Sequence, residues 1–93
     1  MEQERIKLLI VESMVRRKQW GMGYRPIEET LSKVPKRERK EALQVIERLV
    51  QEGLAEYHKN GTCVSLVSSR REEVESYLRE NGNIPGWMLD RLI

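Results

Sequence analysis

The stretch that decides the fold is Pro35-Lys-Arg-Glu-Arg-Lys-Glu-Ala-Leu-Gln-Val-Ile-Glu-Arg-Leu-Val-Gln-Glu-Gly-Leu54, followed directly by Ala55-Glu-Tyr-His-Lys-Asn-Gly-Thr-Cys-Val-Ser-Leu66. Apolar residues in its first half recur at the spacing of one helix face. We therefore expect a helix over residues 36–52, with Gly53 as its C-terminal stop. The inward face of this helix consists of Ala42, Val45, Ile46, Leu49 and Val50.

The second half of the stretch predicts a β-hairpin. Asn60-Gly61 favours a two-residue type I′ turn, and the turn fixes which residues of the two strands lie opposite each other. One face of the hairpin is apolar and is expected to point toward the core. The pairs on that face are Ala55–Leu66 and Tyr57–Val64, and the pairs on the outer face are His58–Cys63 and Glu56–Ser65.

Charge is concentrated at the start of the expected helix. The whole chain carries 17 basic and 15 acidic residues, a net charge of +2. Within Lys33–Lys40, five residues are basic and one is acidic. Cations near a helix N-terminus are disfavoured by roughly 0.3–1 kcal/mol each, because the helix dipole is positive there. This arrangement suggests a partner with negative charge; the alternative is a solvated charged face without a partner.

Shorter signals predict the elements before this stretch. Residues 3–18 show a broad apolar helical pattern, and Trp20–Pro26, with two glycines, is typical of a loop. Ile27, Thr30, Leu31 and Val34 predict a short second helix. Pro35 ends it, because the residue before a proline is disfavoured in the α conformation.

The C-terminal part predicts two further helices. Ser69-Arg-Arg-Glu72 matches a capping box, which opens a helix to about Glu80. The apolar tail over 84–93 predicts a short final helix that covers the core, against the first helix in a monomer, or exchanges with a partner chain in a dimer. Because no linker or repeat divides the sequence, we expect residues 1–93 to form a single domain.

The order helix, helix, helix, hairpin, with Leu49-x-x-x-Gly53-Leu54 leading into the first strand, resembles the winged helix-turn-helix family of small prokaryotic, archaeal and viral transcriptional regulators. The resemblance covers roughly residues 5–67. It implies an α+β, mostly helical fold: a three-helix core plus a two-stranded β-hairpin wing, with a C-terminal helical extension at 68–93. It also implies that the third helix enters the major groove of double-stranded DNA, where Arg and Gln can read guanine and adenine edges.

What the resemblance implies for single residues can be carried over onto this sequence. The single lysine at the wing departs from the strongly basic wings of the family. The residues expected to face the groove are Arg37, Lys40, Glu41, Gln44 and Arg48; Lys36 and Arg39 would reach phosphates, and Lys59 and Asn60 would mark the wing tip.

The function expected from the resemblance is sequence-specific DNA binding by a cytoplasmic transcriptional regulator. A homodimer is expected to form through the extension at 68–93, because Trp87, Met88, Leu89, Leu92 and Ile93 are many apolar residues for a chain end. The alternative is a winged-helix module that binds other proteins within a larger complex and does not bind DNA.

Other functional classes have little support in the sequence. With one histidine, one cysteine and no nucleophile motif, we expect no enzyme, no cofactor and no small-molecule substrate. No apolar run approaches the roughly 18 residues of a membrane span. His58 and Cys63 supply two ligands, whereas a structural zinc site needs four. We expect no metal, although a symmetric dimer could form a Cys2His2 site or a Cys63–Cys63 disulfide.

Overall fold

The computed structural model describes residues 2–93, and its elements confirm the α+β, mostly helical class. Within this range there are five α-helices, two 3₁₀ turns and one three-stranded antiparallel sheet. The helices are α1 (Gln3–Arg16), α2 (Ile27–Thr30), α3 (Arg39–Gln51), α4 (Arg71–Asn81) and α5 (Gly86–Leu92), the 3₁₀ turns are η1 (Lys36–Glu38) and η2 (Ser68–Arg70), and the strands are β1 (Arg25–Pro26), β2 (Ala55–His58) and β3 (Cys63–Leu66).

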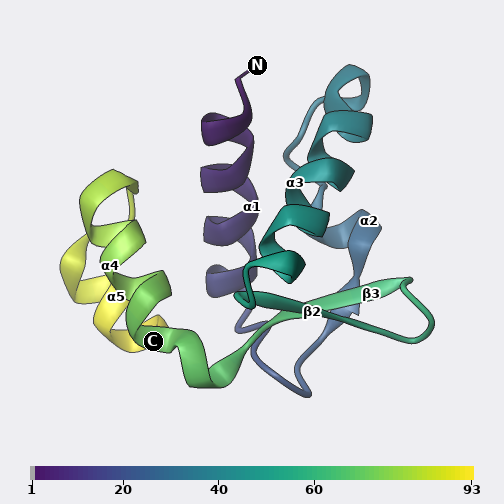
Figure 1. Ribbon diagram of the computed structural model, residues 1–93. Coiled ribbons are helices and arrows are strands. Elements are labelled where there is room, and N and C mark those ends of the chain that lie inside the picture. Colours follow the sequence, from purple (N-terminus) through teal and green to yellow (C-terminus); the bar gives the residue numbers. More distant parts are fainter. Residues whose placement is uncertain (1) are drawn as a thin grey trace.

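Helix α1 lies at the centre of the molecule (Figure 1). Helix α3 packs along one side of it, and α4 and α5 lie together on its other side. The sheet runs across the end where α1 finishes, and the β2–β3 hairpin projects outward beyond α3. None of the helices in the described range is long and apolar enough to cross a membrane.

The core forms where the apolar faces of α1 and α3 meet. Ile6, Ile10 and Met14 of α1 are fully buried, which follows from their spacing of four residues along one helix face. The predicted inward face of α3 is confirmed. Ala42, Val45, Ile46 and Leu49 are buried, and Val50 is half-buried.

The hairpin register is confirmed at all four predicted pairs. Asn60 and Gly61 both have positive φ, of 57° and 84°, as a type I′ turn requires. The Thr62 amide donates to the Lys59 carbonyl over 3.2 Å and closes the turn. The strand β1 was not predicted. It pairs with β3, with Arg25 opposite Val64, so the sheet has three strands in the order β1-β3-β2 and is not the expected two-stranded hairpin.

Burial on the two faces of the hairpin differs from the prediction of one core-facing side and one outer side. Tyr57, expected to point at the core, is 41% exposed because it lies near the outer end of β2. On the face expected to be outer, Cys63 and Ser65 are buried. The segment between α1 and α2 crosses to this face, where Tyr24 stacks on His58 with ring centroids 4.3 Å apart.

Some element starts also differ from the prediction. Residues Lys36–Glu38 form the 3₁₀ turn η1, so the α-helix expected over 36–52 begins at Arg39. The predicted capping box at Ser69 is wrong. Because Ser68–Arg70 form η2, α4 begins at Arg71 with no side-chain cap.

The C-terminal tail forms the expected short helix and packs on its own chain. Leu89 is buried, and Arg16 of α1 donates to the Met88 sulfur over 3.4 Å. The tail therefore takes the placement expected for a single chain, against the first helix. Trp87 is an exception, since 63% of its surface is exposed.

Candidate nucleic-acid interface

The solvent-facing side of α3, together with η1, forms the candidate interface. Positions 40, 44, 47 and 51 of a helix share one face, and the structure exposes all four. These residues are Lys40, Gln44, Glu47 and Gln51. The preceding turn adds Lys36 and Arg37, and 85% of the Arg37 side chain is exposed. We call this set of six residues the α3 face.

The cations at the start of the α3 face are poorly compensated. Arg37 Nε lies 3.9 Å from Glu38 Oε1, at the limit of an ion pair. Lys36 and Lys40 form no ion pair within residues 2–93. All three lie near the N-terminal, positive end of α3, where the helix dipole repels cations. The start of the α3 face is therefore a local concentration of weakly paired positive charge.

Arg39 takes a different position from the one expected. Its Nε donates to the Val34 carbonyl over 3.1 Å, and the residue is half-buried. It falls in phase with the apolar stripe of α3, and the 3₁₀ turn before it brings Val34 within reach. Part of its hydrogen-bonding capacity is used to hold the start of α3.

Glu41 and Arg48 lie on the flank of α3 that turns toward α1. Glu41 is half-buried, and Arg48 lines a small hollow together with Gln3, Glu4 and Lys7 of α1. They are thus displaced from the centre of the exposed face. Lys40 lies at that centre.

Glu47 and Gln51 are the two residues of the α3 face that were not predicted, and Glu47 is the charged one. Glu47 lies seven residues after Lys40 on the same face, a periodicity that the sequence already contains. Its charge acts on Tyr57 of the neighbouring strand. Partial burial, and then the Glu47 carboxylate, raise the pKa of Tyr57 above its ordinary value. The interface therefore has a basic start and an acidic residue further along.

The hairpin turn lies away from the basic start of α3. Lys59 and Asn60 are exposed, and both have positive φ. Figure 1 shows η1 at the end of α3 remote from the sheet, whereas the hairpin tip projects from the sheet itself. The structure therefore separates the expected wing tip from Lys36 and Arg37, which lie at the end of α3 remote from the sheet.

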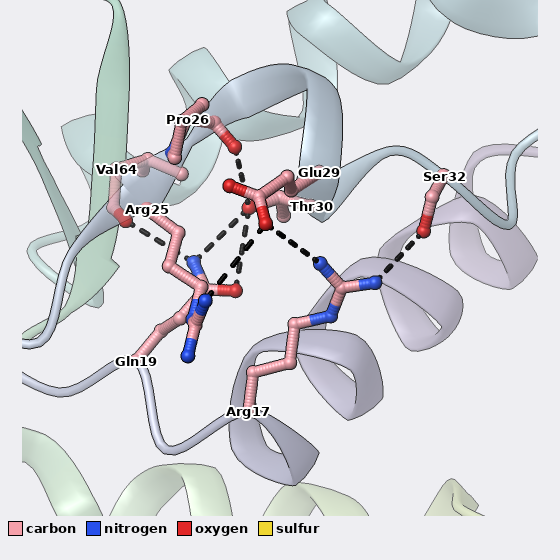
Figure 2. A network of polar contacts seen from close by, with 8 residues as sticks. All are labelled: Arg17, Gln19, Arg25, Pro26, Glu29, Thr30, Ser32 and Val64. Atoms are coloured by element: carbon pink, nitrogen blue, oxygen red, sulfur yellow. Dashed lines mark hydrogen bonds and ion pairs between the residues drawn. The ribbon is translucent and has the colours of Figure 1, made fainter.

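A buried polar network holds the segment before α3 against the sheet (Figure 2). Gln19 is fully buried, and its Nε2 donates to Thr30 Oγ1 over 3.0 Å and to the Val64 carbonyl over 3.2 Å. At its rim, Glu29 lies 4.0 Å from Arg17 and 3.8 Å from Arg25. These contacts fix the position of α2 relative to α1 and β3. They thereby also position the chain segment that leads from α2 into η1.

The remaining candidate ligands stay apart from this surface. His58 Nε2 lies 2.9 Å from Ser65 Oγ and 3.4 Å from Glu56 Oε1, and the part of the chain that the structure describes contains no cluster of three metal-ligating side chains. Comparison with protein-family models, with curated proteins and with solved structures finds no match. The case for a function therefore depends on the geometry of the α3 face.

Proposed function

We propose that this protein binds double-stranded DNA as a winged helix, with α3 in the major groove and the β2–β3 hairpin as the wing. The observation that carries the proposal is the exposed, poorly compensated group of Lys36, Arg37 and Lys40 at the start of α3. The order of three helices followed by a hairpin supports it, since the sheet and helices are compatible with that fold.

The chemistry of the α3 face suits a duplex. A major groove about 12 Å wide admits one α-helix. Lys36 and Lys40 suit phosphates, which position the protein without reading sequence. Arg37 and Gln44 have the planar donor groups that pair with guanine and adenine edges, and Glu47 can accept from cytosine N4. Arg39 and Arg48 are left out of the proposed contacts because Arg39 donates to the Val34 carbonyl and Arg48 lies on the flank of α3 beside α1.

We further propose that the protein acts as a homodimeric transcriptional regulator through its C-terminal extension. Trp87 on α5 is an exposed aromatic residue on the side of α1 away from α3. Contact through this side would leave both copies of α3 free. A twofold dimer could then place two recognition helices in successive major grooves, about 34 Å apart, on a palindromic site.

The second candidate is a module that binds other proteins. Two observations favour it. Glu47 would repel phosphates that approach the centre of the α3 face. Trp87 is an exposed aromatic side chain, the kind of residue that anchors many protein–protein interfaces. Such a module would show little affinity for DNA at any salt concentration.

The test is a double variant, Arg37→Ala with Lys40→Ala, assayed by fluorescence polarisation with duplex DNA at low salt. We expect DNA binding to be abolished while the melting temperature stays unchanged or rises slightly, because two cations leave the positive end of a helix. The matched control is Arg5→Ala with Lys18→Ala, which removes the same charge from exposed sites outside both the α3 face and α5. A stable double variant with undiminished affinity would refute the proposal.

A further inference from the structure

An apolar hollow of about 520 Å³ lies beside the α3 face, between α3, α2 and the hairpin turn at Thr62. Pro26, Ile27, Leu31 and Leu43 form its apolar wall, and Glu28 and Arg39 are its charged members. Leu31 is buried and Ile27 is half-buried, so the wall is continuous with the core.

Leu43 is the part of this wall that α3 supplies, and it is 47% exposed. A single exposed leucine is ordinary on a protein surface. This one is not isolated, because it extends the wall formed by Ile27 and Leu31 onto the same helix that carries Lys40 and Gln44. A ligand bound on the α3 face could therefore contact Leu43 with an apolar group.

The charges around the hollow limit what that ligand can be. Lys36, Arg37 and Lys40 lie on the neighbouring surface of η1 and α3 and favour a polyanion. A ligand bound by these neighbouring cations carries negative charge, and to contact Leu43 it also needs an apolar group. In the major groove of DNA, the apolar group on the base edges is the C5-methyl of thymine.

We propose that Leu43 contacts the methyl group of a thymine and gives α3 a preference for A·T pairs at that position. Gln44, the next residue along the helix, can read an adjacent adenine through its N6 and N7 atoms. This inference rests on the proposed DNA binding and adds a specificity-determining residue to it. It is independent of the phosphate contacts, which carry no sequence information.

The experiment begins with a duplex selected from a random pool by the wild-type protein. Each thymine is then replaced singly by uracil, which removes the methyl and keeps the pairing edges. At one position, uracil should weaken wild-type binding about fourfold, the effect expected for exposing about one buried methylene-sized group. Leu43→Ala should bind the thymine and uracil duplexes equally at that position.

One control variant and two contrary outcomes complete the test. Met22→Ala removes another exposed apolar side chain, 83% exposed and outside the hollow, and should keep the discrimination of the wild type. Equal wild-type affinity for thymine and uracil at every position would overturn the role of Leu43 and leave DNA binding intact. Absence of salt-sensitive binding to any duplex would overturn both proposals.

Discussion

At the scale of single residues, the side chain of Gln19 determines how the segment before α3 sits on the sheet. It is fully buried and donates to Thr30 Oγ1 and to the Val64 carbonyl, which belong to α2 and β3. A buried acceptor that loses its donor bears the full cost of its desolvation. The amide therefore couples three parts of the chain that lie far apart in sequence.

Replacement of this amide should be costly. We expect Gln19→Leu to lower the free energy of unfolding by about 1–3 kcal/mol, because the Thr30 hydroxyl and the Val64 carbonyl lose their donor. Urea denaturation would measure the change. Gln51→Leu, the same substitution at an exposed site, should change the free energy of unfolding by no more than about 0.5 kcal/mol. Equal stability of the two variants would show that the buried network contributes nothing.

Sequence alone could place some residues of the candidate interface and not others. Helical spacing was enough to predict that Gln44 is exposed and Ile46 is buried. It could not place Arg39, because its bond to the Val34 carbonyl depends on the 3₁₀ turn between them. Glu47 could have been found from the spacing of Lys40 and Gln44, since positions 40, 44 and 47 share one helix face.

At the scale of elements, the β2–β3 hairpin depends on its turn. Gly61 has φ of +84°, a conformation that costs a residue with a side chain roughly 1–2 kcal/mol. A Cβ added there would meet nothing within 4 Å, so steric conflict adds nothing to that cost.

Gly61→Ala should therefore destabilise the protein through the backbone alone. We expect a loss of about 1 kcal/mol, or a melting temperature lower by roughly 4–8 °C. Thermal unfolding followed by circular dichroism would measure it. An unchanged melting temperature would mean that the turn does not need the left-handed conformation.

The elements divide into those with a strong local signal and those without one. Asn60-Gly61 determined the register of β2 and β3, and all four pairs were predicted correctly. The strand β1 has two residues, too few to show an alternating pattern, and it forms only because Arg25 and Pro26 lie against β3. The capping signal at Ser69 failed because Ser68–Arg70 form a 3₁₀ turn, which moves the helix start to Arg71.

At the scale of the whole molecule, α1 separates two surfaces of different character. The α3 face and the hairpin lie on one side, and α4 and α5 lie on the other (Figure 1). Cations gather at the start of α3, whereas α5 exposes an aromatic residue, Trp87. This division would allow a dimer contact and a DNA contact to form independently.

The proposed dimer can be tested through Trp87. We expect the wild-type protein to have twice the monomer mass of 11.0 kDa by size-exclusion chromatography with light scattering. Trp87→Glu should reduce it to the monomer mass, because a charge would be buried without a partner in the interface. Met22→Glu, at a site 83% exposed outside α4 and α5, should remain dimeric. A monomeric wild type, or a dimeric Trp87→Glu variant, would contradict this interface.

The most direct measurement of DNA binding is the affinity for random-sequence duplex DNA by fluorescence polarisation at about 50 and 200 mM salt, the range over which phosphate contacts show their effect. We predict micromolar affinity at the lower concentration and a loss of at least about tenfold at the higher one, since two neutralised phosphates alone give a change of that size. Absence of binding at the lower concentration, or binding that does not respond to salt, would contradict the assignment and favour the protein-binding module.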